Sequence, residues 1–205
     1  MARKILHIDA SARGANSESR RLTSEFLQRW HAASPEDVVI HRDIVDNPLP
    51  HVDSIFLDGL MTPEAERTPE QQQAVARSDE LINEFLTADV LVLGVPMYNF
   101  GIPSTLKAWL DHISIAGRTF QYTAAGPKGL VSNKPVYILS TRGGIYDDSP
   151  MEHQTSYLKT MLGFFGIEDI HVIQAEGLNL SPEGREKSVA GAIAQIRKEV
   201  ETATA

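Results

Sequence analysis

One stretch of the chain constrains the fold more than any other: the run from Val90 to Pro96, Val-Leu-Val-Leu-Gly-Val-Pro, carries no charged or hydrogen-bonding side chain. A short, unbroken apolar run of this kind is typical of a strand covered by helices on both faces of a parallel sheet. A strand with one face in water would alternate apolar and polar residues instead. The run therefore predicts an α/β fold with this strand near the middle of the sheet.

Four shorter strand-like runs, at residues 5–10, 38–40, 136–139 and 170–173, alternate with segments of helical periodicity. Two helix boundaries are clear, because Thr68-Pro69-Glu70-Gln71 matches a capping box and Gly166 suits a helix C-terminus. Strand–helix units joined by right-handed crossovers give a doubly wound, five-stranded parallel sheet of order 2-1-3-4-5, with helices on both faces. We expect residues 1–205 to form one such domain.

Two segments lie outside this alternation. Residues 46–68 contain Pro48, Pro50 and Pro63 and show no clear period, so they predict an irregular excursion, which in a compact domain is usually functional or mobile. Residues 119–122 and 129–131 predict a short hairpin-like excursion. Both segments are interpreted as walls of a substrate site.

Composition excludes several classes of protein. The chain has no cysteine, which excludes disulfides, Cys-ligated metal sites and thiol nucleophiles and fits a reducing, cytoplasmic setting. A net charge of −8 argues against a nucleic-acid or anionic-membrane partner, and no apolar run approaches the ~20 residues of a membrane span. Seven histidines show neither His-x-His nor His-Glu-x-x-His spacing, so no metal site is expected, and His7 and His112 are interpreted as structural.

In a sheet of this topology, ligands bind beyond the carboxyl ends of the first and third strands, where the winding direction switches. The loop after the first strand has neither a Rossmann nor a P-loop glycine pattern, but it carries Ser11, Asn16, Ser17 and Ser19 at the start of a helix. Unpaired N–H groups and the helix dipole make such a place an anion site, and a phosphate is the natural occupant. Ordinary helix capping by Asn16 or Ser17 explains this loop equally well.

The loop after the third strand contains Met97, Tyr98, Asn99 and Phe100 between two prolines. Met97 and Tyr98 are placed so that they could cover a flat ring. Backbone N–H groups near Asn99 could reach the redox-active nitrogen of a flavin. The alternative is an apolar plug of the core that precedes a helix.

The loop after the fourth strand contains Thr141, Arg142, Gly143 and Gly144. Paired glycines let a backbone approach a ligand closely, so their N–H groups would suit the carbonyl oxygens of a pyrimidine-like ring edge. The alternative is a tight turn in which Arg142 makes a surface ion pair. Three loops at the switch point with compatible chemistry, for a phosphate, a ring face and a ring edge, favour a ligand site over three separate structural explanations.

Over nearly its whole length the chain resembles the FMN-dependent NADH-azoreductases of bacteria, relatives of the NAD(P)H:quinone oxidoreductases, whose fold is flavodoxin-like. The resemblance rests on Pro96-Met97-Tyr98-Asn99-Phe100 and Thr141-Arg142-Gly143-Gly144, supported by Ser17-Glu18-Ser19, Thr119-Phe120-Gln121-Tyr122 and Gly163-Phe164-Phe165-Gly166.

The resemblance implies bound FMN, NADH as the electron donor, and a quinone or azo compound as the acceptor, reduced by two electrons in a ping-pong hydride transfer. It implies a homodimer with active sites at the interface and Phe120 near the substrate. The FMN contacts that it implies are Ser11, Ser17, Glu18, Ser19, Met97, Tyr98, Asn99, Phe100, Thr141, Arg142, Gly143 and Gly144.

Because the cofactor performs the chemistry, no catalytic acid–base pair is required, and Tyr122 is the one side chain considered as a proton donor. The dimer is also favoured by Phe100, Trp109 and Phe120, which would leave more aromatic surface than a monomer exposes. Two alternatives remain: a flavodoxin-type FMN electron carrier without a small-molecule substrate of its own, and a flavin-free structural or regulatory domain.

Overall fold

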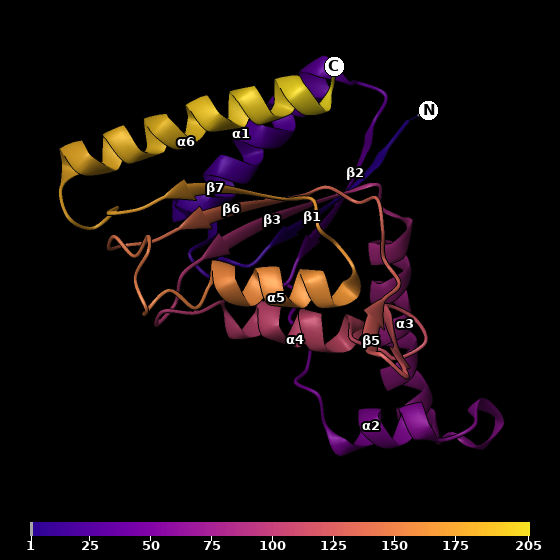
Figure 1. Cartoon of the computed structure of the whole chain (residues 1–205). Coiled ribbons are helices and arrows are strands. Elements are labelled where there is room, and N and C mark those ends of the chain that lie inside the picture. The colour runs from indigo at the N-terminus through magenta and orange to yellow at the C-terminus, as the bar shows by residue number, and fades with distance from the viewer. Residues whose placement is uncertain (1) are drawn as a thin grey trace.

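The computed structural model describes residues 2–205, whose centre is a sheet of five parallel strands in the order β2-β1-β3-β6-β7 (Figure 1). The predicted doubly wound order is therefore confirmed. Every residue of the central strand β3 is buried, as its composition requires. The strands are β1 (Lys4–Asp9), β2 (Val38–Asp43), β3 (Val90–Pro96), β6 (Val136–Thr141) and β7 (Ile170–Ala175).

Helices cover both faces of the sheet (Figure 1). On one face lie α1 (Glu18–Ala33) and α6 (Pro182–Ala203); on the other lie α3 (Pro69–Thr87), α4 (Ser104–Ile113) and α5 (Thr155–Phe165). Alternate residues of β1 divide between the two cores, because successive strand side chains point to opposite faces. Ile5 packs with Phe26 and Trp30 under α1, whereas Leu6 and Ile8 pack on the opposite side.

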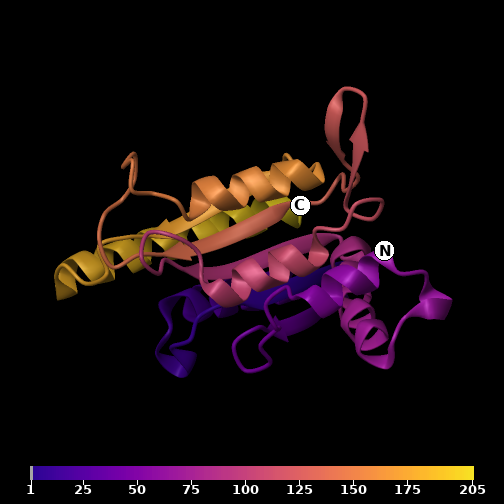
Figure 2. The same cartoon turned by 90° about the horizontal axis from the view of Figure 1, so that it is seen from below.

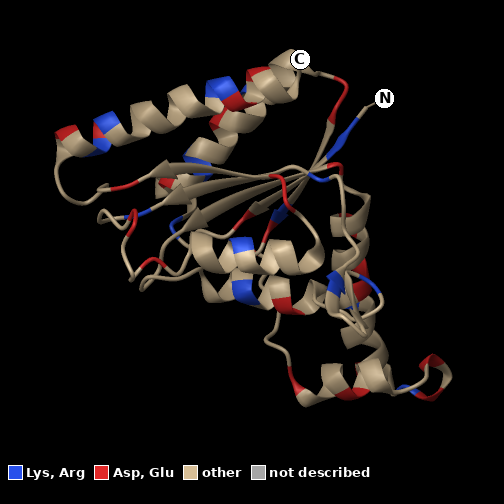
Figure 3. Ribbon diagram, in the orientation of Figure 1, with Lys and Arg blue, Asp and Glu red and all other residues tan. Residues whose placement is uncertain are grey.

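The helix boundaries read from the sequence are confirmed. The hydroxyl of Thr68 accepts a hydrogen bond from the N–H of Gln71, whose side chain in turn accepts one from the N–H of Thr68. Gly166 ends α5 at φ 99°, a left-handed conformation that favours glycine. Charged residues gather on the helices and loops, and among the strands of the main sheet only β1 and β2 carry them (Figure 3).

The prediction of an irregular 46–68 segment is wrong in part. It contains α2 (Ser54–Met61), capped by Asp53, and the short 3-10 turn η2 (Glu64–Glu66). Helix α2 packs closely on α3, since a Cβ on Gly59 would lie 3.1 Å from a Val75 methyl carbon. Its apolar residues are spread around the helix, with Ile55, Leu57 and Met61 exposed, so no single apolar face is visible in the sequence.

The predicted hairpin exists, but its second strand begins earlier than expected, with β4 (Phe120–Thr123) paired to β5 (Gly126–Gly129). It projects from the body of the molecule beside the C-terminal end of α5 (Figure 2). The ring of Phe120 packs at 4.4 Å from that of Phe164 and is 7% exposed. Trp109 is fully buried against Phe85, so neither Trp109 nor Phe120 supplies the aromatic surface expected of them.

Candidate functional site

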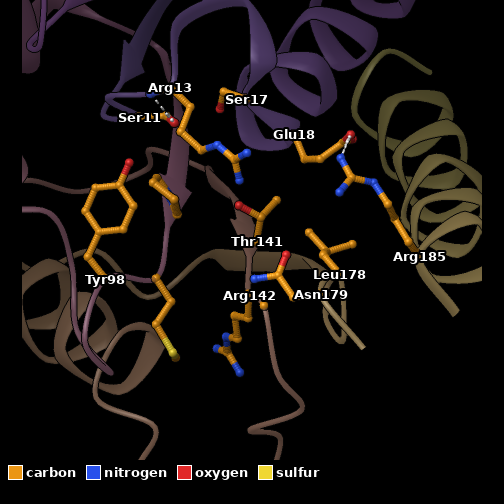
Figure 4. A pocket seen from close by; sticks show the side chains of 13 residues that line it. Ser11, Arg13, Ser17, Glu18, Tyr98, Thr141, Arg142, Leu178, Asn179 and Arg185 are labelled. Atoms are coloured by element: carbon orange, nitrogen blue, oxygen red, sulfur yellow. Dashed lines mark hydrogen bonds and ion pairs between the residues drawn. The ribbon is translucent and has the colours of Figure 1, made fainter. Parts of the chain in front are cut away.

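A cavity of about 240 Å³ opens at the carboxyl ends of the strands, where the loops after β1, β3, β6 and β7 meet (Figure 4). The topological switch between β1 and β3 lies at this point, as the sheet order requires. The three loops singled out by sequence thus form one site. Of the predicted residues, those that line it are Ser11, Ser17, Glu18, Met97, Tyr98, Thr141, Arg142 and Gly143.

The first loop reaches α1 through the 3-10 turn η1 (Gly14–Asn16), and Ser17 then caps the helix. The N–H of Arg20 donates to the hydroxyl of Ser17 at 3.3 Å, and that hydroxyl lies 3.1 Å from the hydroxyl of Ser19. Ser17 therefore caps α1, as the capping interpretation expects, and it also lines the cavity. The positive end of α1 and the buried hydroxyls favour an anion there.

Two arginines of the cavity were missed by the sequence analysis. Arg13 directs its side chain into the cavity, and no ion pair of Arg13 occurs within residues 2–205 (Figure 4). Arg185, in the first turn of α6, pairs with Glu18 at 2.6 Å across the rim. Arg13 follows directly on Ser11 and Ala12 and was recognisable from its position. The approach of Arg185 to Glu18 depends on the packing of α6 beside α1 and has no local signal.

The loop after β3 makes a tight two-residue turn. Tyr98 and Gly101 exchange two backbone hydrogen bonds of 3.0 and 3.1 Å, and the residues between them, Asn99 and Phe100, have φ of 47° and 72°. Two positive φ angles in a two-residue turn define the type I′ geometry, which is strained for a residue as bulky as phenylalanine. Strain of this kind gathers at ligand sites.

The same turn is held toward the first loop. The hydroxyl of Tyr98 accepts a hydrogen bond from the N–H of Ala12 at 3.1 Å. Phe100 is 39% exposed and meets the ring of Tyr146 edge-on at 5.8 Å. Within residues 2–205, the N–H groups of Asn99 and Phe100 have no hydrogen-bond acceptor. Two free donors and a partly exposed ring thus lie at the edge of the cavity.

The glycines after β6 allow close packing against two neighbouring side chains. A Cβ on Gly143 would lie 2.5 Å from the side-chain nitrogen of Asn179, and one on Gly144 would lie 2.9 Å from the ring of Tyr146. The carbonyl of Gly143 accepts a hydrogen bond of 2.9 Å from the N–H of Asn179. The glycines were expected to let the backbone approach a ligand closely, and in the structure they approach the side chains of neighbouring loops. Asn179 also lines the cavity, and the sequence analysis did not indicate it.

Arg142 is 2% exposed, so it makes no surface ion pair, and its guanidinium points away from the serines (Figure 4). It donates to Glu176 at 2.6 Å, to Glu152 at 3.0 Å and to Gln154 at 3.0 Å. Gln154 in turn donates to the carbonyl of Val95 at 2.8 Å. The side chain of Arg142 therefore joins the loops after β6 and β7 to the end of β3, while its backbone N–H donates to the carbonyl of Ala175 at 2.9 Å and its carbonyl accepts from the N–H of Leu178 at 3.2 Å.

The electrostatics of this network favour its charged state. Burial raises the pKa of the Glu152 carboxyl, but hydrogen bonds from Thr155 and the charge of Arg142 outweigh it, so the net pKa lies below its usual 4.5. The carboxylate accepts from the N–H groups of Gln154 and Thr155 at 2.8 Å each. The segment that begins α5 is thereby fixed in place beside the cavity.

Phe120 and Tyr122 do not join the site of their own chain. Phe120 packs on Phe164 at the C-terminal end of α5, and Thr119 binds the carbonyl of Ile113 at the C-terminal end of α4. The cavity lies at the opposite ends of these helices, and the ten residues of α4 span about 15 Å. Tyr122 is 76% exposed on the projecting hairpin.

These features define a doubly wound α/β protein whose switch-point cavity suits a phosphate beside a flat ring. A family model described as flavodoxin-like fold matches residues 3–200. The chain belongs to this flavodoxin-like family, and within it to the group that contains the FMN-dependent NADH:quinone oxidoreductases and azoreductases.

Two kinds of relative support this placement. A protein of Azotobacter vinelandii named FMN-dependent NADH:quinone oxidoreductase is 51% identical over 189 residues, 92% of this chain and 95% of that protein. A Pseudomonas fluorescens protein named FMN-dependent NADH:quinone oxidoreductase 2 is 50% identical, over 94% of this chain and 97% of its own. Among solved structures, an azoreductase of Bacillus anthracis is similar with a TM-score of 0.91 and 33% identity, over 98% of this chain and all of that one.

A second Bacillus anthracis structure, an FMN-dependent NADH-azoreductase in complex with FMN, is 28% identical with a TM-score of 0.91, and both chains are covered completely. No helix within residues 2–205 combines the length and the apolar character needed to cross a membrane.

Proposed function

We propose that this protein is an FMN-dependent NADH:quinone oxidoreductase that also reduces azo compounds. The observation that carries the proposal is the switch-point cavity, which joins a buried-serine anion site at the start of α1 to the strained turn after β3. The names of the relatives point to the same cofactor, donor and acceptor. The electron-carrier alternative has no observation of its own in its favour.

The cavity residues fit the phosphate of FMN. The phosphate carries about −1.5 to −2 charges at neutral pH. Arg13 and the N-terminal end of α1 would attract it, and the hydroxyls of Ser11 and Ser17 would donate hydrogen bonds to it. Glu18 is the one unfavourable charge, and Arg185 neutralises it at 2.6 Å. Ser19 acts through its hydrogen bond to Ser17.

The remaining assignments place the ring on the two later loops. Met97 and Tyr98 would contact its face, and the free N–H groups of Asn99 and Phe100 would donate to its edge. Thr141, Gly143 and Gly144 would contribute backbone groups, with Arg142 holding their loop. Bound FMN would supply the two-electron redox chemistry between NADH and a quinone or azo compound, and the same cavity would receive the donor and the acceptor in turn.

The assembly that we propose is a homodimer. Because Phe120 and Tyr122 lie about a helix length from their own cavity, a role near the substrate requires the hairpin of a second copy. A monomeric mass at micromolar concentration would contradict this part. Tyr122 remains the proposed proton donor, and an unchanged turnover in Tyr122→Phe would eliminate it.

The proposal takes residues 1–205 as one FMN-binding domain that works in the cytoplasm. Its direct test is steady-state turnover of NADH with a quinone, measured for apoprotein and for apoprotein reconstituted with FMN. Turnover that requires FMN supports the enzyme, and parallel double-reciprocal lines support the ping-pong order. FMN binding without NADH oxidation would favour an electron carrier.

A further inference from the structure

A second cluster of chemically capable side chains lies under α1, at the edge of the sheet away from β6 and β7. His7 and Asp9 are two residues apart on β1 and therefore point to the same face. The parallel register pairs His7 directly with His41 of β2. Since β1 and β2 are the strands of the main sheet that carry charged residues, the cluster is a local exception to an apolar sheet (Figure 3).

The three side chains converge. The Nε2 of His41 lies 3.1 Å from Oδ2 of Asp9, and the Nε2 of His7 lies 3.3 Å from Oδ1 of the same carboxylate. One candidate ligand atom from each residue lies within 4.8 Å of the others. With Zn–N and Zn–O bonds of ~2.0–2.1 Å, neighbouring ligands of a tetrahedral zinc ion are about 3.3 Å apart. Each imidazole lies near that spacing from one oxygen of the carboxylate, His41 from Oδ2 and His7 from Oδ1. The two rings stack with their centroids 4.6 Å apart, so the rings must turn toward each other to share an ion.

The Nε2 of His7 faces the Asp9 carboxylate without making a hydrogen bond of good geometry to it. The residue is 6% exposed, and its Nε2 finds no hydrogen-bond partner within residues 2–205. An unpartnered buried nitrogen is unfavourable unless something binds it. His41, by contrast, has half of its side chain in solvent, which gives an ion a way in and leaves room for water to complete the coordination.

The surrounding charges leave a place for a cation. Asp9 and Asp43 carry two negative charges against the single positive charge of Arg20. Arg20 is engaged by Asp43 and by two hydrogen bonds to the carbonyl of Ser11, at 2.9 and 3.1 Å, and lies 3.5 Å from Asp9. The hydroxyl of Thr23 lies 3.3 Å from Oδ1 of Asp9 and 3.0 Å from the carbonyl oxygen of Arg20, and its one proton can serve either acceptor.

We propose that His7, Asp9 and His41 form a binding site for a divalent metal ion of the zinc type. Two imidazoles and a carboxylate are a ligand set that suits zinc and its first-row neighbours. The ion would join the edge strand β2 to β1 beneath the loop that carries Ser11, outside the cavity proposed for FMN. Sequence spacing did not indicate the site, because His41 reaches His7 through strand register.

The test is calorimetric titration of Zn²⁺ into the untagged, FMN-loaded protein at neutral pH, for the wild type and for His41→Gln. The expected result is one ion per chain, with the dissociation constant raised at least tenfold in His41→Gln. His51→Gln, an exposed histidine on the 46–68 segment, is the matched control and is expected to bind as the wild type does. Unchanged circular dichroism and FMN content would show that His41→Gln is folded.

Two further readouts do not depend on the heat of binding. Zn²⁺ is expected to raise the thermal midpoint of the wild type and of His51→Gln and to leave that of His41→Gln unchanged. Co²⁺ is expected to give absorption bands at longer wavelengths than flavin absorbs, and Asp9→Asn is expected to lose them. Absence of stoichiometric Zn²⁺ binding, or binding that His41→Gln leaves intact, would overturn the proposal while leaving the FMN site untouched.

Discussion

The hydroxyl of Tyr98 lies 3.1 Å from the backbone nitrogen of Ala12, so a side chain of the loop after β3 accepts a hydrogen bond from the loop after β1. These two loops leave the sheet on either side of its switch point. The contact therefore fixes the width of the cavity in which we place FMN.

Tyr98→Phe removes this hydrogen bond and keeps the ring. One neutral hydrogen bond contributes ~0.5–1.5 kcal/mol, so the dissociation constant of FMN is expected to rise about two- to tenfold. Fluorescence titration of apoprotein with FMN measures it. Tyr157→Phe, on α5 and outside the lining of the cavity, serves as control and should bind as the wild type does. Equal affinity of wild type and Tyr98→Phe would show that the contact does not shape the site.

Arg13→Gln removes a cation from the phosphate end of the cavity. Because hydrogen bonds to charged groups contribute ~1.5–3 kcal/mol, FMN affinity is expected to fall at least tenfold. Riboflavin, which has no phosphate, should bind both proteins equally. Arg197→Gln, on an exposed part of α6, controls for net charge. A matching loss of riboflavin affinity would remove Arg13 from the phosphate site.

The strain at Phe100 predicts an unusual order of stability between two variants. At φ 72°, glycine is the favoured residue, so Phe100→Gly should unfold with a free energy about 1 kcal/mol higher than Phe100→Ala. Urea denaturation of the apoproteins measures the difference. At Leu180, an exposed loop residue without positive φ, the alanine variant should be the more stable of the pair. If the alanine variant were the more stable one at Phe100 as well as at Leu180, Phe100 would be unstrained.

His112 predicts a loss of stability in acid. Burial lowers its pKa below 6.5, although its hydrogen bond to the carbonyl of Pro50 at 3.0 Å opposes the shift. Arg77 lowers the pKa further, and the charge of Asp111 raises it. Since the unfolded chain then binds the proton more tightly, the free energy of unfolding must fall as the pH drops below 6.5.

Replacing His112 with glutamine keeps a donor for Pro50 and removes the proton-binding group. The slope of unfolding free energy against pH, measured from pH 7 downward, should be smaller in His112→Gln than in the wild type. His31→Gln, an exposed histidine of α1, should leave the slope as it is. A slope unchanged by His112→Gln would show that this histidine is not the group that titrates.

Features set by near neighbours in the chain were predictable. The strand at Val90–Pro96 and the cap at Thr68 depend on residues within a few positions, and the three site loops follow from the strand order. Features that depend on distant partners were not. The pairing of Glu18 with Arg185 and the packing of Asn179 on Gly143 arise only when helix and loop meet in space.

Two aromatic residues that the sequence analysis expected at the surface show how tertiary packing limits such predictions. Trp109 lies on the inner stripe of α4, where its period places it, and that position buries it in the core and removes it from any surface. Phe120 belongs to a hairpin whose place at the far ends of α4 and α5 no local pattern encodes. Composition identifies aromatic side chains, but tertiary packing decides whether they are exposed.

The central claim is that the switch-point cavity holds an FMN that exchanges electrons with both NADH and a quinone. An anaerobic visible spectrum of the FMN-loaded protein, recorded before NADH, after NADH and after a quinone, tests it in one sample. The account predicts a flavin band that NADH bleaches and the quinone restores. A protein that retains no flavin, or a flavin band that NADH leaves unchanged, would contradict it.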